Sequence, residues 1–289
     1  MHKRDFLKSL SLAGISLPFS GLAMEQWVNK YAMMSADQVA TEEDFWSVIR
    51  SGYVLKTDYI NLENGYYNFL PQNILEAYIQ NIRDVNKQGA FYMRTVQGEN
   101  KKKSVEQLAT LAGCSAEELI ITRNTTESLD TIIGGFPWQP GDEAVMAHQD
   151  YGAMLDMFRL VAKRHGVVNK LVSVPNNPQS DEEIVQVYAN AITPKTKLLM
   201  VCHVINITGQ VMPVQKICDM AHSKGVQVLV DGAHAFAQLN FKIPDLHCDY
   251  YGASLHKWLS VPLGAGILYV KKDLIHQNWP LLGPSEGEE

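Results

Sequence analysis

Two short stretches of the chain place an acid, an amine and other polar side chains directly after apolar runs. An apolar run at 226–230 ends in Asp231, and a Gly-Ala-His turn follows at once. This pattern is typical of a buried parallel strand that delivers one carboxylate to its C-terminal tip. Further along the chain, a second strand-like run closes with Ser254, His256 and Lys257. The sequence thus predicts an acid at one strand tip and an amine at another.

Lys257 and Asp231 suit the chemistry of pyridoxal phosphate (PLP). A lysine amine forms a Schiff base with the aldehyde of this cofactor, and a carboxylate keeps its pyridine nitrogen protonated so that the ring accepts electrons. Hydroxyl, imidazole and backbone donors can bind its phosphate, which makes Ser254 and His256 candidates for that role. The structural alternative is that Asp231 is a turn residue and Lys257 a solvated loop charge.

The two motifs together, Asp-Gly-Ala-His at 231–234 and Ser-x-His-Lys at 254–257, resemble the class V aminotransferase family. That family also holds the cysteine desulfurases and the isopenicillin N epimerase-like proteins. The resemblance runs from about residue 59 to the end of the chain. It implies an α/β protein of fold type I, the large domain of a PLP-dependent transferase, with a mainly parallel seven-stranded sheet and helices on both faces. It also implies that Lys257 releases the cofactor to an amino substrate and then acts as general base at the α-carbon.

Apolar runs alternate with helix-like stretches from residue 118 onward. This alternation predicts a parallel sheet covered by helices on both faces, and ligands of such sheets bind beyond the carboxyl ends of the strands. The predicted strands span 119–122, 143–147, 167–174, 197–204 and 226–230, and the predicted helices span 125–134, 151–165, 181–192 and 214–224. The candidate site residues follow the ends of these strands.

The first of these strands leads into a helix start that suits a phosphate. Asn124, with Glu127 three residues on, is typical of a capping box. A helix N-terminus offers free backbone N–H groups and a favourable dipole to an anion. The family resemblance implies that three hydroxyls and one imidazole hold the cofactor phosphate: Thr125, Thr126, Ser254 and His256. An ordinary helix cap is the structural alternative.

Further strand ends supply candidates around the cofactor ring. Related epimerase-like sequences carry an acid followed by a tyrosine after the second strand, so Asp150-Tyr151 favours Tyr151 as the residue that stacks on the pyridine ring. His148 is the competing candidate, and a tyrosine packed in the core is the structural alternative. The resemblance places Asn206 close to the ring oxygen and the substrate, and His234 in hydrogen-bonding position to that oxygen.

The composition is that of a folded protein and argues against nucleic-acid binding. Of the 289 residues, 46% are hydrophobic and 19% are charged, which supplies a sizeable core. The formal net charge of −6 argues against a nucleic-acid surface, and beyond the N-terminus no apolar stretch is long enough to span a membrane. The four cysteines form no C-x-x-C pair, so we expect buried free thiols and no metal site.

Residues 1–23 have the layout of a cleavable export signal, with a basic start, an apolar stretch and a small-residue end. Lys3-Arg4 and the residues that follow resemble the twin-arginine signal, with lysine in place of the first arginine. We therefore expect a periplasmic protein, and an amphipathic N-terminal helix on a cytoplasmic protein is the alternative. Residues 24–70 are expected to form an N-terminal segment anchored by Trp27, Phe45 and Trp46, and residues 71–289 the PLP-binding large domain.

The sequence leaves the reaction open. Members of the family usually continue through a small C-terminal domain with an arginine that clamps the substrate carboxylate, whereas this chain stops about thirty residues after Lys257. We expect a fragment of a longer protein, or an abbreviated one, in which that domain is absent. The resemblance also implies a homodimer, in which residues 264–269 reach the cofactor of the partner subunit. The expected activity is that of an aminotransferase or epimerase acting on a small amino substrate; a cysteine desulfurase or lyase, and a truncated homologue without activity, are the alternatives.

Overall fold

The computed structural model describes residues 21–281, with side chains from residue 26 on. The chain divides into two compact units. The first unit holds the chain up to Val96 together with Ser260–Pro262, and the second holds Gln97–Leu259 and the residues from Leu263 on. All of the candidate site residues lie in the second unit.

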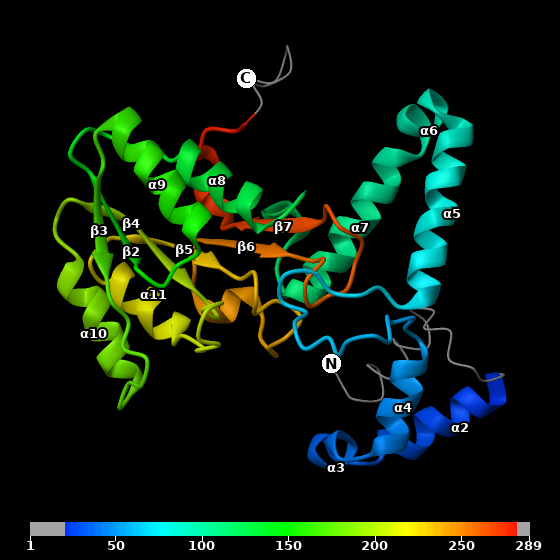
Figure 1. Ribbon diagram of the computed structural model, residues 1–289. Helices are drawn as coiled ribbons and strands as arrows, with labels where there is room; N and C mark the ends of the chain where they lie inside the picture. Colours follow the sequence, from blue (N-terminus) through cyan, green and yellow to red (C-terminus); the bar gives the residue numbers. More distant parts are fainter. Residues whose placement is uncertain (1–20, 282–289) are drawn as a thin grey trace. The chain divides into compact units, whose positions relative to one another are not determined.

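The second unit is built on one sheet of seven strands in the order β1-β7-β6-β5-β4-β2-β3 (Figure 1). β7 runs antiparallel to both of its neighbours, and the other strand pairs are parallel. The strands are β1 (Leu119–Thr122), β2 (Glu143–Ala147), β3 (Val168–Val172), β4 (Thr196–Cys202), β5 (Gln227–Asp231), β6 (Tyr250–Ser254) and β7 (Gly266–Val270). The expected seven-stranded, mainly parallel sheet is confirmed.

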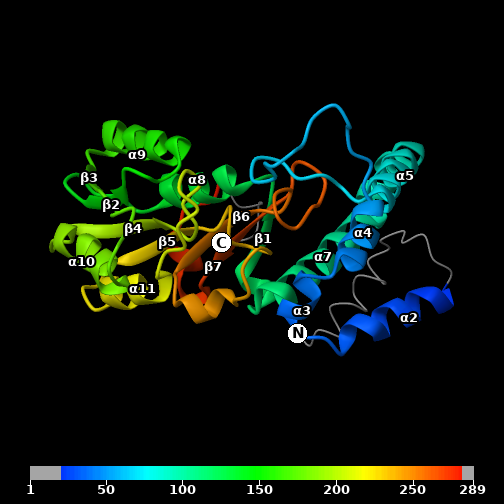
Figure 2. The ribbon, with the colours of Figure 1, turned by 60° about the horizontal axis from the view of Figure 1, so that its bottom comes forward.

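Helices cover both faces of this sheet, as Figures 1 and 2 show. On one face α8 (Thr125–Gly135) packs against α9 (Gly152–His165), and on the other α10 (Asp181–Ala191) packs against α11 (Val214–His222). The apolar side chains between α8, α9 and the sheet form one buried cluster, which includes Leu129, Ile132, Phe158, Met146, Met200 and Leu229. α7 (Gln97–Ala112) packs against β1 at the other end of the sheet.

The strand order reverses between β2 and β4. From β2 the chain passes through α9 to β3 at the edge of the sheet, and from β4 it passes through α11 to β5 in the opposite direction. Ligands of open α/β sheets bind in the crevice that such a topological switch point creates at the carboxyl ends of the strands. The β2–β4 pairing covers only Glu143 to Val145 on β2, whereas the β4–β5 pairing continues to Cys202 and Asp231. The fold therefore places the strand ends that carry the candidate site residues where a ligand is expected to bind.

The predicted strands and helices match the observed elements to within two residues at each end. One expectation for this region is corrected. Residues 266–269, expected to reach a partner subunit, belong to β7, which lies between β1 and β6 with all of its residues buried. Because the residues of this strand are buried within one chain, they do not extend to a partner, whereas a contact through Gly264 and Ala265, before β7, stays a prediction. Dimer formation itself stays a prediction.

The first unit contains a small aromatic core. Trp27 stacks on Phe45 with 5.0 Å between the ring centroids, and Tyr31 meets both rings edge-on. Trp46, expected as a third anchor, is 48% exposed, although its ring meets Phe45 edge-on and its Nε1–H donates to the Ala40 carbonyl at 2.9 Å. The helices are α2 (Gly21–Ala32), α3 (Ala36–Ala40), α4 (Glu43–Ser51), α5 (Gln72–Gln88) and α6 (Ala90–Thr95).

The boundary between the units differs from the expected one. α5 and α6 bury none of their side chains, and they belong to the first unit, so the chain divides after Val96 and not after residue 70. The expected export signal at residues 1–23 lies outside the described residues except for its last three positions, and export stays a prediction. Between residues 21 and 281, no helix has both the length and the apolar character needed to cross a membrane.

Gly232, directly after Asp231, is required by close packing. A Cβ at this position would lie 2.0 Å from Cζ and 2.1 Å from Oη of Tyr251, whose side chain is fully buried in β6. We therefore expect Gly232→Ala to lower the free energy of unfolding by about 2–3 kcal/mol, measured by urea denaturation. Gly98→Ala is the control, because a Cβ there meets nothing within 4 Å and alanine favours the helix. Equal stability of the two variants would contradict the packing argument.

Candidate active site

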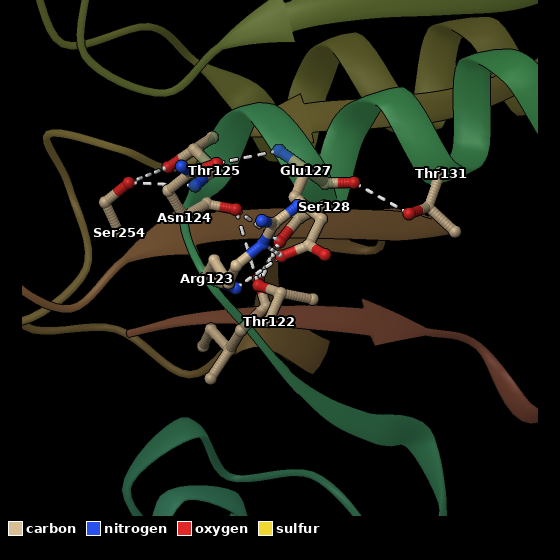
Figure 3. A network of polar contacts seen from close by, with 9 residues as sticks. Thr122, Arg123, Asn124, Thr125, Glu127, Ser128, Thr131 and Ser254 are labelled. Atoms are coloured by element: carbon tan, nitrogen blue, oxygen red, sulfur yellow. Dashed lines mark hydrogen bonds and ion pairs between the residues drawn. The ribbon is translucent and has the colours of Figure 1, made fainter. Parts of the chain in front are cut away.

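The N-terminus of α8 is shaped by side chains that turn back on its first turn (Figure 3). Asn124 is the N-cap residue, and its side chain accepts the Glu127 N–H at 2.8 Å. Glu127 Oε2 accepts the Arg123 N–H at 2.6 Å, where a capping box would use the N–H of Asn124. The predicted helix start is confirmed. The bond that Glu127 makes in return goes to the N–H of Arg123, one residue before the N-cap.

A buried pair of hydrogen bonds joins the start of α8 to the end of β6. The Thr125 N–H donates to Ser254 Oγ at 2.8 Å, and the two hydroxyl oxygens lie 2.7 Å apart (Figure 3). Gly266 permits this approach, since a Cβ on it would lie 2.8 Å from the backbone of Asn124. Two of the four expected phosphate ligands thus lie together at a helix N-terminus, where the free N–H groups and the helix dipole favour an anion.

The other two expected phosphate ligands have different surroundings. Thr126 faces a cavity of about 310 Å³ at the same helix start. The cavity is also lined by Arg123, Asn124, Glu127, Asp130 and Leu281. His256 is buried. Burial and the positive charge of Lys257 lower the pKa of its imidazole, whereas a hydrogen bond to the Ala265 backbone raises it. A neutral imidazole has a single N–H, and the Ala265 backbone takes it up, so a hydrogen bond from His256 to a phosphate oxygen stays a prediction.

The acid, the amine and one imidazole meet at the ends of β5 and β6. Asp231 is buried at the end of β5, and its Oδ1 accepts the Ala233 N–H at 3.0 Å. Burial raises the pKa of Asp231, and the Ala233 N–H and the charge of Lys257 oppose that shift. Lys257 Nζ lies 3.0 Å from His234 Nε2. Because a buried carboxylate is costly without a cationic partner, this end of the site is suited to a positively charged group.

The two candidates for stacking on the cofactor ring are both exposed. Tyr151 immediately precedes α9 and is 45% exposed. His148 is also exposed, with its backbone N–H bound to the Val172 carbonyl at 2.8 Å. The structure therefore removes the alternative of a tyrosine packed in the core and leaves Tyr151 and His148 as competitors.

Asn206 lies outside the tight grouping of acid and amine. It is exposed in a turn after β4, and the pairing of Val204 with Val211 closes that turn. The Ile205 N–H donates to the Gln210 carbonyl at 3.0 Å across the same turn. Asn206 thus stands on a closed hairpin at the carboxyl edge of the sheet, and its contact with ring oxygen or substrate stays a prediction.

The structure adds a buried titratable group that sequence reasoning noted only as the residue before Tyr151. Asp150 is 6% exposed, and its Oδ2 accepts the Ala147 N–H at 2.7 Å. Cys202, at the end of β4, lies close enough to this carboxyl for each group to affect the pKa of the other. The available sequence signal was an acid three residues after a strand, which is also the signal of an exposed loop charge.

The residues at this edge of the sheet fit PLP. A buried carboxylate suits a protonated pyridine nitrogen, and a lysine amine lies near enough for its charge to act on that carboxylate. At the other end, hydroxyls and N–H groups meet at a helix start that favours a phosphate. The donor set thus matches both charged ends of the cofactor.

Comparison with known families agrees with this site. Residues 69–287 match the model of the aminotransferase class-V family, a PLP-dependent family, so the expected cofactor is confirmed at the level of the family. Isopenicillin N epimerase of Streptomyces clavuligerus is 27% identical over 225 residues, which cover 78% of this chain and 56% of that protein. A cysteine desulfurase of Escherichia coli is 33% identical over 194 residues, covering 65% of this chain and 47% of that protein. The chain spans about half the length of these curated relatives.

Solved structures with the same fold include C–S bond-cleaving enzymes. A lysine-to-alanine mutant of C-DES, with glycine covalently linked to its PLP cofactor, superposes with a TM-score of 0.70 at 25% identity, over 78% of this chain and 60% of that one. The cysteine desulfurase CsdA of Escherichia coli gives a TM-score of 0.70 at 25% identity, over 82% of this chain and 60% of that one. By its sequence match, its sheet and the arrangement of its acid, amine and helix start, the chain belongs to the aminotransferase class-V family.

Proposed function

We propose that this chain is the PLP-binding part of an enzyme that moves the α-proton of an amino acid. The observation that carries the proposal is the grouping of Lys257, His234 and the buried Asp231 at the ends of β5 and β6. When bound, PLP supplies an aldehyde that links to an amine and a ring that takes up electrons from a bond broken at the α-carbon. The remaining steps depend on the residues of this chain.

Different residues hold the two ends of the cofactor. Thr125 and Ser254, at the start of α8, would bind the phosphate with backbone N–H and hydroxyl donors. Asp231 would hold a proton on the ring nitrogen, because a cation offsets the cost of its buried charge. Such contacts at both ends fix the ring in one orientation relative to Lys257.

Lys257 is the group that takes the α-proton and returns it. An amine acts as a base only in its neutral form, in which Nζ carries a free electron pair. His234 Nε2, 3.0 Å from Nζ, accepts a hydrogen bond from the amine when Nδ1 carries the imidazole proton. His234 thereby restricts the direction in which Nζ points.

The cysteines among residues 26–281 leave the choice between transamination, epimerisation and desulfuration open, because the chain spans only about half of its relatives. Sulfur transfer to an enzyme cysteine needs an accessible thiolate. Burial raises the pKa of the thiols of Cys202, Cys218 and Cys248, and the half-buried Cys114 has a pKa raised to about 11. Among residues 26–281 there is thus no cysteine suited to accept sulfur. The similarity to cysteine desulfurases and to C-DES supports the desulfurase or lyase as the second candidate.

The cofactor part of the proposal is tested by absorption spectroscopy of the purified chain with added PLP. We expect a yellow protein whose colour is lost on borohydride reduction, with a pyridoxyl mass on the peptide that contains Lys257. A colourless chain, or a pyridoxyl mass on another lysine, would overturn the proposal.

The reaction class is tested by two assays on the same preparation. Nuclear magnetic resonance in deuterated water follows exchange of the α-proton of added amino acids, and a colorimetric assay follows sulfide released from cysteine. Exchange without sulfide supports the aminotransferase or epimerase chemistry. Sulfide release from cysteine would replace it with the desulfurase or lyase.

Ser254→Ala should weaken cofactor binding without removing it. The substitution deletes the hydroxyl that bonds Thr125 and would contact the phosphate, so we expect the dissociation constant for PLP to rise about tenfold. Fluorescence titration measures the constant. Ser223→Ala is the control, because its hydroxyl is exposed and bonds only within the end of α11, to the Met220 carbonyl. Equal constants for the two variants would contradict the phosphate assignment.

A further inference from the structure

The loop that follows β6 carries Lys257 and turns back into β7. Two backbone hydrogen bonds hold its base: the Leu255 N–H donates to the Ala265 carbonyl at 2.9 Å, and the Lys257 N–H donates to the Ser254 carbonyl at 3.4 Å. Three residues beyond the lysine, Ser260 adopts the left-handed backbone conformation, with a φ of +53°. Because residues other than glycine disfavour this conformation, it persists only where neighbouring contacts hold it in place.

One such contact comes from a residue far away in the sequence. Asn68 Nδ2 donates to Ser260 Oγ at 2.8 Å, and both residues are half-buried. The other end of the same amide is also fixed, since Asn68 Oδ1 accepts the Phe69 N–H at 2.8 Å. Asn68 and Ser260 both belong to the first unit, which includes Ser260–Pro262. The amide of Asn68 is thus held at both ends and directed at the hydroxyl of Ser260.

We infer that Asn68 is a positioning residue for Lys257, because its amide holds Ser260 in the left-handed turn that sets the path of the chain next to the lysine. Only Trp258 and Leu259 separate Ser260 from Lys257, so a change of backbone conformation at Ser260 is transmitted to the main chain that carries the lysine. An amine that must link to PLP and also reach the α-proton needs a narrow range of positions. The inference rests on the proposed function, since it concerns Lys257 as the residue that links the cofactor.

The test compares two ligands that differ only at the carbon that meets Lys257. PLP links to the lysine through its aldehyde, whereas pyridoxine 5'-phosphate has the same ring and phosphate with an alcohol in that place. A residue that positions Lys257 therefore affects the binding of PLP and leaves that of pyridoxine 5'-phosphate unchanged. For Asn68→Ala we expect the dissociation constant for PLP to rise about three- to tenfold, and that for pyridoxine 5'-phosphate to change by less than about twofold. Fluorescence titration of the purified chain measures both constants.

Matched variants separate the hydrogen bond from other effects of the substitution. Asn68→Asp should stay close to the wild type, since its carboxylate accepts a hydrogen bond from the Ser260 hydroxyl and still accepts the Phe69 N–H. Ser260→Ala should match Asn68→Ala, and the double variant should show no further rise, because both substitutions remove the same bond. Ser260→Gly should lie closer to the wild type than Ser260→Ala, since glycine adopts a positive φ without steric cost. Asn190→Ala, which removes an exposed amide that bonds within α10, is the control and should keep the wild-type constants.

Several results would overturn the inference. One is Asn68→Ala with the wild-type constant for PLP, and another is an equal rise in the constants for both ligands, which would indicate a general structural role. An additive double variant, or Asn68→Asp that binds PLP no better than Asn68→Ala, would also contradict it. Ser260→Ala decides the matter if Asn68→Ala does not fold.

Failure of the proposed function would look different. The wild type would then bind PLP no more tightly than pyridoxine 5'-phosphate and would carry no pyridoxyl mass on Lys257 after borohydride reduction. That outcome is seen in the wild type alone, before any variant is compared, and the inference about Asn68 would fail with it.

Discussion

Lys257→Ala is expected to lose its covalent link to PLP and to lower the rate of α-proton exchange by about a thousandfold or more. The amine is the only part of the proposed site that both attaches the cofactor and takes the proton, so one substitution removes two functions. The absorption of the bound cofactor should shift toward that of free PLP. Borohydride reduction should leave no pyridoxyl mass on the peptide around residue 257.

Binding of the cofactor should survive that substitution. Asp231 and the start of α8 remain in place, so PLP should still bind, with a larger dissociation constant. Lys257→Ala should therefore bind PLP without a covalent bond and should not exchange the α-proton of an added amino acid. Lys224→Ala, at an exposed position after α11, is the control. Full exchange activity in Lys257→Ala would remove this lysine from the mechanism.

The strand tips could be predicted from sequence because their signals are local. An apolar run that ends in a single acid specifies both a buried strand and the place of its carboxylate, and Asp231 lies where this pattern puts it. The start of α8 was equally readable, since Asn124 and Glu127 define a cap within four residues of chain. Both strand ends lie at one edge of the sheet because parallel strands have their carboxyl ends on the same side.

The groupings that depend on contacts between strands could not be read in this way. Asp150 and Cys202 are separated by two helices and a strand, and only the strand order brings them together. The sequence analysis did not predict β7 as a strand. Its apolar run after Gly264 was interpreted, through the family resemblance, as a contact with a partner subunit. The division after Val96 could not be predicted either. The amphipathic pattern of α5 suggests a helix packed against a core, and yet none of its residues is buried.

Asp231 illustrates how the site and the stability of the fold oppose one another. Burial raises the pKa of this carboxyl in the folded chain, so above the ordinary carboxyl pKa of about 4 the folded state binds more protons than the unfolded state. Stability therefore falls as the pH rises from that value through the raised pKa of Asp231. The charged form that the ring nitrogen needs is thus the form that costs the cofactor-free protein stability at neutral pH.

Asp231→Asn should consequently stabilise the cofactor-free protein while it impairs the site. The amide keeps an oxygen for the Ala233 N–H and carries no charge to bury, so we expect a gain of about 1 kcal/mol or more in the free energy of unfolding near neutral pH. The gain should vanish at acid pH, where the wild-type carboxyl is protonated as well. The dissociation constant for PLP should rise about ten- to a hundredfold, since a buried cation then has no counter-charge. Urea denaturation without cofactor and fluorescence titration with it measure the two effects, and Asp156→Asn, which removes an exposed charge from α9, should show neither. A variant that is less stable than the wild type without cofactor would mean that the carboxylate already has a sufficient partner in Lys257.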